Sequence, residues 1–511
     1  MFARLKSMGL SGIHGFMVEV EADISGGLPG FDVVGLPGPA VKESRDRVRS
    51  ALKNSGFTYP VSRITVNLAP ADVRKEGSVY DLPLLLALLS ASSQLPPIAE
   101  DYAFVGELSL TGEVRPVHGV LPMVIAARDH GIHHVFVPAA CAAEGGVVDG
   151  IAVYPVENAL QLIHHLIGST PIEPLTAETL PPPPTLPLPD FEDVMGQTAA
   201  RRAMEIAAAG GHNILLIGPP GSGKSMLAKR LPSILPDMTR EEQLETTKIH
   251  SVAGTLPGGI GLLTARPFRA PHHNISSAGL VGGGTIPRPG EVSLAHHGVL
   301  FLDELPEFSR SAMECLRQPL EDGKVTISRV ASSLTYPCSF MLVAAMNPCP
   351  CGFFGHPTRA CTCSTTAARQ YLSRISGPLL DRVDLHIDVP PVEFTQLAQT
   401  QKAESSAAIR ARVNAARARQ LARFAAAGAD NLICNAQIPS NLLKTLCPLT
   451  EGATALLGRA FDRMGLSARA YDRLLKVART IADLDGSDVV DIPHISEAIQ
   501  YRSLDRKYWM K

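Results

Sequence analysis

The residues with the clearest chemistry in this chain follow a short apolar stretch and read Gly-Pro-Pro-Gly-Ser-Gly-Lys-Ser. The glycines allow backbone N–H groups to wrap around phosphate oxygens, Lys224 supplies a cation for the outer phosphates, and Ser225 supplies a hydroxyl for Mg²⁺. A glycine-rich turn without a ligand is the alternative, but the flanking strand and helix patterns argue against it. We predict that ATP and Mg²⁺ bind at Gly218, Pro219, Pro220, Gly221, Ser222, Gly223, Lys224, Ser225 and Met226.

A pair of carboxylates stands 78 residues after Ser225, at the end of the apolar run Gly-Val-Leu-Phe-Leu. We predict that Asp303 holds the shell of the Mg²⁺ ion and that Glu304 polarises the attacking water. The alternative is a strand that ends in two solvated acids. The preceding phosphate-binding pattern favours the catalytic interpretation.

Three further residues have side chains suited to the remaining roles in a site for phosphoryl transfer. Asn347 follows the next apolar stretch, where its amide can orient the lytic water; an asparagine that begins a turn before a proline is the alternative. We predict that Arg382 reaches the γ-phosphate held by a neighbouring subunit, with Arg374 as the second choice. Arg469, which opens a later helix, is the predicted lid sensor. A surface salt bridge is the alternative for each arginine.

Two CxC pairs, nine residues apart, follow closely after Asn347. Four thiolates at this spacing can close a tetrahedral Zn²⁺ site, and we predict structural zinc there, with His356 as an alternative ligand. Four free thiols or a redox pair are the other interpretations. The four predicted ligands are Cys349, Cys351, Cys361 and Cys363. The remaining cysteines are expected to be isolated buried residues.

A proline-rich stretch separates the elements that must position these residues. Eight of the 23 residues in 168–190 are proline, which favours an extended, semi-rigid linker. We predict an N-terminal α+β domain over 1–167, an α/β core with a parallel sheet over 191–390, and a helical lid over 391–511. The expected strands are 17–22, 63–68, 213–217, 299–302 and 340–345, and the expected helices are 40–55, 81–89, 197–209 and 226–231.

The composition gives no global argument for a nucleic-acid partner. The formal net charge is −2, with 45% hydrophobic and 19% charged residues, so any DNA-binding surface must be local. No uninterrupted apolar run reaches the length of a membrane span, and the first residues lack the pattern of a secretory leader. We therefore expect a cytoplasmic protein without disulfides.

Longer motifs carry a family resemblance. Residues 268–276, Phe-Arg-Ala-Pro-His-His-Asn-Ile-Ser, and the glycine-rich stretch 279–298 resemble the magnesium-chelatase-like branch of AAA+ ATPases. Residues 25–37 and 67–72 resemble the ComM/YifB family. The resemblance implies a hexameric ATP hydrolase that moves along single-stranded or branched DNA. It also implies branch migration while donor DNA is integrated in natural transformation, with recombination proteins as further partners.

The N-terminal domain resembles the proteolytic domain of Lon, which has a ribosomal S5-type α+β fold. Val79 stands where that family has its serine, and Leu121 stands where it has its lysine. Ser78 is one position away from the expected serine. Without a hydroxyl and an amine base we predict no proteolysis. An ATP-dependent protease and a metal-chelatase motor are the alternatives to a DNA motor, although chelatase motors lack this fused domain.

Two segments are the predicted DNA-facing parts. The resemblance implies that the insertion 279–291, which contains Arg288, faces the pore of the ring. The segment 324–335 reads as two strands joined by a polar turn, and Lys324, Arg329 and Ser332 are its predicted phosphate contacts. A solvated hairpin is the alternative. The arginine-rich segment 402–423 suits either a DNA-facing helix or an ordinary lid helix.

Overall fold

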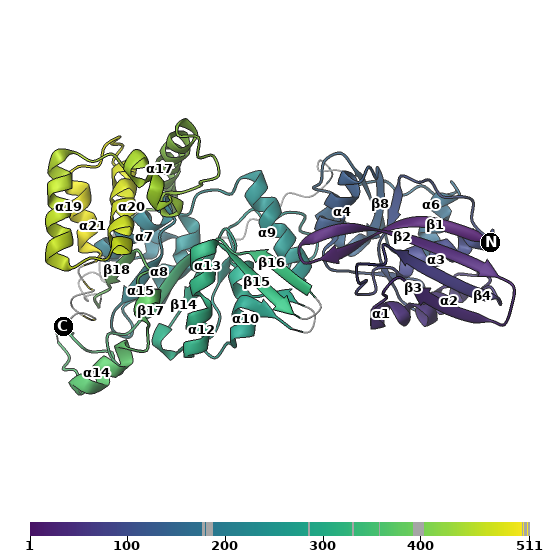
Figure 1. The fold of residues 1–511 in the computed structure, drawn as a ribbon, viewed down its shortest axis with the longest axis horizontal. Helices are drawn as coiled ribbons and strands as arrows, with labels where there is room; N and C mark the ends of the chain where they lie inside the picture. The colour runs from purple at the N-terminus through teal and green to yellow at the C-terminus, as the bar shows by residue number, and fades with distance from the viewer. Residues whose placement is uncertain are drawn as a thin grey trace. The chain divides into compact units, whose positions relative to one another are not determined.

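A computed structural model describes residues 1–175, 179, 188–284, 287–329, 332–356, 358–391, 403–502, 504 and 508. The chain divides into two units. The first comprises 1–185 and 240–264, and the second comprises 186–239 and 265–511. In Figure 1 the first unit is mostly purple and blue, and the helices that end the second unit are yellow.

A seven-stranded mixed sheet forms the centre of the first unit. Strands β1 and β2 pair antiparallel over their whole length, and β5, β8 and β9 extend the sheet in parallel. The spatial order is β3 (Gly30–Val34), β4 (Arg63–Ala69), β2 (His14–Ser25), β1 (Phe2–Ser11), β5 (Tyr102–Phe104), β8 (His134–Pro138) and β9 (Ala152–Val156). In β4 every second residue is buried, so only one face of this strand lies fully in the core.

Helices and a short strand pair complete this unit. Helix α3 is apolar all round, with ten of its eleven residues buried, as expected of a helix enclosed by the core. The elements are α1 (Pro39–Lys42), α2 (Ser44–Asn54), α3 (Asp81–Ala91), β6 (Glu107–Leu108), β7 (Val114–Arg115), α4 (Val120–Asp129), η1 (Ala139–Cys141), α5 (Ala142–Gly145), α6 (Ala159–Leu166) and α9 (Arg240–Ala253).

The second unit is built on a five-stranded parallel sheet. Its three central strands are buried along their whole length, as is typical of a parallel sheet covered on both faces, and the two edge strands are only partly buried. The order is β11 (Phe268–Arg269), β14 (Val299–Leu302), β17 (Met341–Met346), β10 (Ile214–Ile217) and β18 (Leu385–Asp388). The predicted site residues follow β10, β14 and β17, so parallel pairing of these three neighbours brings them to one edge of the sheet.

The other elements of the core surround this sheet or extend from it. They are η2 (Phe191–Asp193), α7 (Thr198–Gly210), α8 (Lys224–Arg230), η3 (Leu231–Ser233), α10 (Ser277–Val281), β12 (Gly282–Gly283), β13 (Arg288–Pro289), α11 (Glu291–Leu294), η4 (Leu305–Glu307), α12 (Arg310–Cys315), α13 (Arg317–Asp322), β15 (Lys324–Arg329), β16 (Ser332–Pro337), α14 (Thr365–Leu372) and α15 (Gly377–Leu380).

A helical lid follows the sheet. Helix α17 and helix α20 both pack against α7, and α20 also packs along α21. The lid elements are α17 (Ser406–Ala426), η5 (Asn435–Gln437), η6 (Ser440–Leu442), α18 (Leu443–Leu446), α19 (Glu451–Met464), α20 (Ala468–Leu484) and α21 (Ile492–Gln500). Within the described part of the chain, no helix combines the length and the apolar character that crossing a bilayer requires.

The structure confirms the predicted fold class, a mixed α/β protein with a parallel-sheet core and a helical C-terminal region. The expected strands and helices are all present, with ends displaced by a few residues. The expected helix 40–55 is interrupted at Glu43 and forms α1 and α2.

The two units differ from the predicted division into domains, because the predicted lid belongs to the same unit as the core sheet and residues 240–264 belong to the first unit. Residues 240–264 lie within the predicted core range 191–390, but they pack with the first unit. Helix α9 packs on α4, the Ser251 hydroxyl donates to the Glu144 carboxylate at 2.5 Å, and Arg240 donates to the Val147 carbonyl at 2.7 Å. These partners are about 90 or more residues away in the sequence, so a linear reading could not assign α9 to that unit.

Candidate functional site

The glycine-rich loop connects β10 to α8 in a conformation that glycine makes possible. Gly221 and Gly223 have φ angles of 77° and 91°, in the left-handed region that other residues rarely adopt. A side chain at Gly218 would collide with the carbonyl oxygen of Val389, the residue that directly follows β18. The backbone therefore requires glycine at these three positions.

Lys224 lies almost fully buried beneath this loop, 8% exposed. Its ammonium donates to the carbonyl oxygens of Gly218 and Pro219 at 2.7 and 2.9 Å, and to the Asn347 side-chain oxygen at 3.3 Å. Burial lowers the pKa of Lys224, while the nearby carboxylates Asp303 and Glu304 act in the opposite direction. The loop thus holds a cation where phosphate oxygens would be favourable partners.

Ser225 and Asp303, the two predicted magnesium ligands, are in direct contact. The Ser225 hydroxyl donates to the Asp303 carboxylate at 2.6 Å, although 78 residues separate them. The other Asp303 oxygen accepts the backbone N–H of Glu304 at 3.0 Å. A hydroxyl and a carboxylate so placed are suitable ligands for Mg²⁺ or for its water shell.

Glu304 has an unusual backbone conformation, with a φ of 52°. A non-glycine residue in this region costs free energy, and such residues are concentrated at functional sites. Its carboxylate is more than half exposed and lies 3.4 Å from the Nδ1 atom of His273. The motif containing His273 supported the family resemblance, but the sequence analysis gave the residue no role.

Asn347 directly follows β17 and lies beside the loop. Its side chain contacts Lys224, and Tyr371 on α14 lies near enough for the Asn347 backbone to influence the pKa of its hydroxyl. Burial, followed by the nearby Glu307 carboxylate, raises the pKa of Tyr371 to about 12, so this hydroxyl stays protonated. Sequence spacing alone could not have indicated Tyr371, because α14 reaches the site only through tertiary packing.

These residues surround one pocket of about 360 Å³. It opens where the ends of β10, β14 and β17 meet. Its lining contains most of the predicted nucleotide residues, while Gly218 and Pro219 contribute carbonyl groups to Lys224 instead. The lining residues are Pro220, Gly221, Ser222, Gly223, Lys224, Ser225, Met226, Asp303, Glu304, Met346 and Asn347.

Gln197 and Asn213 are bracing residues that the sequence analysis did not identify. The Gln197 amide donates to the carbonyl oxygens of Ser222 and Pro390 at 3.3 and 2.6 Å. The Asn213 amide donates to the Arg382 carbonyl at 2.9 Å, and its oxygen accepts the Leu342 N–H at 2.8 Å. Asn213 thereby joins β10, β17 and the segment that carries the predicted arginine finger.

The two predicted arginines share one acid of α13. Arg382 donates to the Glu321 carboxylate and to the Pro378 carbonyl, and Arg469 lies 4.0 Å from the same carboxylate. Hydrogen bonding from Arg382 holds the pKa of Glu321 below its usual range. The structure thus brings the predicted finger and the predicted lid sensor together, and neither arginine lines the Lys224 pocket of the same chain.

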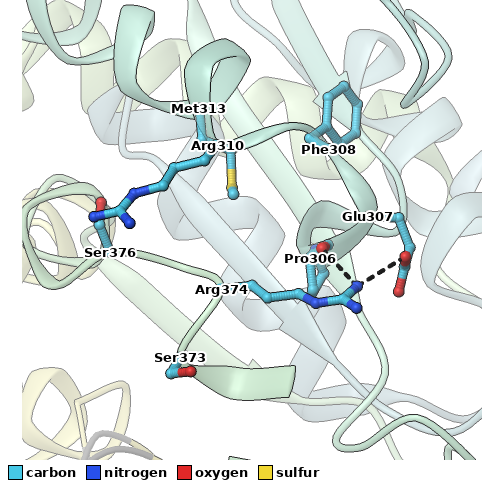
Figure 2. A pocket seen from close by; sticks show the side chains of 8 residues that line it. All are labelled: Pro306, Glu307, Phe308, Arg310, Met313, Ser373, Arg374 and Ser376. Carbon is cyan, nitrogen blue, oxygen red and sulfur yellow. Dashed lines mark hydrogen bonds and ion pairs between the residues drawn. The ribbon is translucent and has the colours of Figure 1, made fainter. Parts of the chain in front are cut away.

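Arg374, the second choice for the finger, borders another pocket (Figure 2). Its guanidinium points toward Pro306 and Glu307, donating to the Glu307 carboxylate at 2.9 Å. This pocket, of about 480 Å³, is lined by Pro306, Glu307, Phe308, Arg310, Met313, Ser373, Arg374 and Ser376. Since Glu307 follows Glu304 by three residues, Arg374 lies beside the strand end that carries the predicted catalytic acid.

The predicted DNA-facing segments pack on each other. Strands β15 and β16 form a hairpin, and its Tyr336 hydroxyl donates to the Pro287 carbonyl at 2.9 Å. The Ile327 side chain lies against Gly282 of the β12–β13 pair, in which Arg288 is exposed. The hairpin and the insertion, which are separated by more than 30 residues in sequence, are therefore in direct contact.

The three residues of the hairpin that are predicted to contact DNA phosphates lie at different ends of it. Lys324 is exposed at its base, opposite Pro337, whereas Arg329 and Ser332 pair next to the turn. The side chains of Arg329 and Ser332 lie outside the described residues. One face of the hairpin consists of exposed hydroxyl residues in two cross-strand pairs, Thr326 with Thr335 and Ser328 with Ser333.

The arginines of α17 have partners within the second unit. Arg412 forms ion pairs with Glu205 and Glu404, and Arg423 donates to both oxygens of Asp483. The side chains of Arg410, Arg417 and Arg419 donate to backbone carbonyls. This pattern favours the ordinary lid helix over the DNA-facing helix.

The residues that would form a proteolytic dyad are apolar and inside the first unit. Val79 is 7% exposed and Leu121 is fully buried. The Ser78 hydroxyl donates to the Glu107 carboxylate. The partner of Ser78 is therefore a carboxylate and not the lysine amine that acts as the base in a serine–lysine dyad.

Three family descriptions match this chain. Residues 190–397 match "Magnesium chelatase, subunit ChlI", residues 20–141 match "Subunit ChlI of Mg-chelatase", and residues 403–502 match "Magnesium chelatase, subunit ChlI C-terminal". Together with the parallel sheet, the phosphate-binding loop and the lid, they define a magnesium-chelatase-like AAA+ ATPase. This class implies ATP hydrolysis with Mg²⁺.

Comparison with individual proteins identifies the family within this class more closely. The protein YifB of Escherichia coli (strain K12) is 45% identical over 97% of this chain and 96% of its own length. The competence protein ComM of Haemophilus influenzae is 44% identical over the same shares. The magnesium-chelatase 67 kDa subunit of Chlorobaculum parvum is 30% identical, over 31% of this chain and 23% of its own. The chain belongs to the ComM/YifB family.

Proposed function

We propose that this chain is a cytoplasmic ATP-driven DNA motor that assembles into a homohexameric ring. In this proposal it moves single-stranded or branched DNA and promotes branch migration during integration of donor DNA, alongside recombination proteins. The relative named as a competence protein, similar over nearly its whole length, supports this biological setting.

The observation that carries the DNA part is the hydroxyl face of the hairpin. Thr326, Ser328, Ser333 and Thr335 present two cross-strand pairs of exposed hydroxyls, and the insertion beneath them carries an exposed arginine, Arg288. Hydroxyl and guanidinium groups are frequent partners of phosphate oxygens. Such contacts carry no sequence information, which is what a motor that moves along any DNA requires.

In the proposed ATP site, the residues of this chain have separate tasks. Lys224 and the loop N–H groups would hold the phosphates, and Ser225 and Asp303 would hold a magnesium ion, which would supply positive charge beside the phosphates. Glu304 polarises the lytic water, with His273 fixing the orientation of its carboxylate and Asn347 oriented toward the same pocket. The ring brings Arg382 of the neighbouring subunit to the γ-phosphate, after release from Glu321.

The test compares ATP hydrolysis without DNA and with single-stranded, forked and four-way branched DNA. We expect stimulation by DNA and strand exchange on the branched substrate. The variant Thr326→Ala/Ser328→Ala/Thr335→Ala should lose much of the stimulation but keep basal turnover. Thr454→Ala on α19 is the control, because this exposed hydroxyl lies on the lid. Hydrolysis indifferent to every DNA would contradict the proposal and favour the chelatase-type motor.

A further inference from the structure

Four thiols converge in the loop between β17 and α14. The Sγ atoms of Cys349, Cys351, Cys361 and Cys363 all lie within 4.8 Å of one another. Separations of 3.4, 3.5 and 3.7 Å join Cys349 to Cys351, Cys351 to Cys361, and Cys349 to Cys361.

These separations are those of ligands around a single ion. Four sulfurs about 2.3 Å from a central Zn²⁺ form a tetrahedron with edges of about 3.8 Å. A disulfide would bring two sulfurs to about 2.05 Å, far closer than any pair here, and all four cysteines are free. The N–H of Cys351 also donates to the Cys363 sulfur at 3.4 Å, the kind of outer contact that stabilises a thiolate ligand.

His356, the alternative ligand considered from the sequence, has another role. Its Nδ1 atom accepts backbone N–H groups of Thr358 and Arg359 at 3.2 and 3.1 Å, which closes the turn between the two CxC pairs. It is not among the clustered ligand atoms. The described residues of this loop thus offer a set of four sulfurs.

The cysteine loop is built into the nucleotide site. Asn347 precedes Cys349 by two residues, and Gly352, with a φ of 83°, lies so close to Pro220 that a side chain there would overlap the proline ring. At the other end, Ser364 follows Cys363 directly and caps α14, accepting the Ala367 N–H at 3.1 Å. The same α14 carries Tyr371, whose hydroxyl lies near the Asn347 backbone.

We propose that the four cysteines bind one structural Zn²⁺, and that this ion holds Asn347 and the phosphate-binding loop in their working positions. Between 347 and 364 the described residues form no helix or strand, so coordination would supply order that secondary structure does not. The metal site stands independently of the DNA function. Only its influence on turnover rests on the proposed ATP site.

The metal content of the purified full-length protein tests the site. We expect about one zinc per chain by mass spectrometry, and its loss in Cys361→Ser/Cys363→Ser. Cys361→His should keep the ion, because imidazole is also a zinc ligand. Cys315→Ser is the matched control, since this free cysteine lies on α12 outside the cluster. Protein that contains no zinc and takes up none when titrated with Zn²⁺ would overturn the proposal.

Reversible removal of the ion tests its influence on the nucleotide site and avoids variants that fail to fold. Zinc is released by a mercurial reagent that binds the thiols, and is then restored with excess dithiol and Zn²⁺. We expect ATP turnover to fall roughly 10- to 100-fold, the scale for a displaced catalytic group, and to recover with the metal. Unchanged turnover in zinc-free protein would overturn the coupling between the two sites while leaving the DNA assay unaffected.

Discussion

The ion pair between Asp384 and Arg473 links the lid to the sheet, and its two partners differ in burial. Asp384 directly precedes β18 and its side chain is 6% exposed, whereas Arg473 on α20 is 22% exposed. They meet at 2.6 Å. The other Asp384 oxygen accepts the Asn213 N–H at 3.0 Å and lies 3.4 Å from His212. We predict that Arg473→Met destabilises the protein more than Asp384→Asn.

The expected loss of folding stability depends on the group that each substitution leaves without a partner. Arg473→Met leaves a buried carboxylate without its cation, and breaking a buried pair in this way costs about 3–5 kcal/mol. Asp384→Asn leaves a partly exposed guanidinium that can reach water, so the loss is nearer that of a charged hydrogen bond, about 1.5–3 kcal/mol. The double variant should cost less than the sum of the two, because the partners share one interaction.

The contribution of Asp384 to folding stability should decrease as the pH falls. Burial by itself raises the pKa of Asp384, but Arg473 and His212 outweigh it and hold this pKa well below its usual range. The stabilisation is therefore complete above about pH 4, the unfolded value, and is lost as pH falls toward the folded pKa. The stability difference between wild type and Arg473→Met should narrow below about pH 4.

Urea denaturation followed by circular dichroism, at pH 7 and at acidic pH, measures these differences. Arg459→Met serves as the control because this arginine is exposed on α19. We expect its midpoint to stay near that of the wild type. Equal costs for the two single variants, or strict additivity in the double variant, would refute the reasoning from unequal burial.

Three further predictions concern the proposed sites. Lys224→Met should abolish binding of a fluorescent ATP analogue, because it removes the buried cation; retained binding would show that the nucleotide lies elsewhere. Glu304→Gln should keep ATP binding but lower turnover by at least about a hundredfold, as expected for loss of a general base, and should stabilise the assembled ring on sizing columns. Ser78→Ala should leave casein cleavage at background like the wild type, since Val79 and Leu121 supply no dyad; cleavage abolished by this substitution would revive the protease.

The pocket around Lys224, where we propose that ATP binds, was largely predictable as a cluster of residues because its parts have local signatures. The glycines with positive φ and the apolar strands are properties of short segments. Parallel pairing of these strands then requires Asp303 and Asn347 to approach the loop. The residues that support this pocket, such as His273 and Tyr371, have no comparable signature, because each comes from a distant segment and contributes through one contact.

The sequence alone determined the chemistry of the phosphate-binding loop and the strand-and-helix order around it. Both depend on interactions among neighbouring residues. Tertiary structure decided two other matters: the packing of α9 with the first unit, and the pairing of Arg382 and Arg469 with Glu321. Each is a contact between segments whose proximity depends on how the whole chain packs, and the free energy of such contacts leaves no periodic pattern in the sequence.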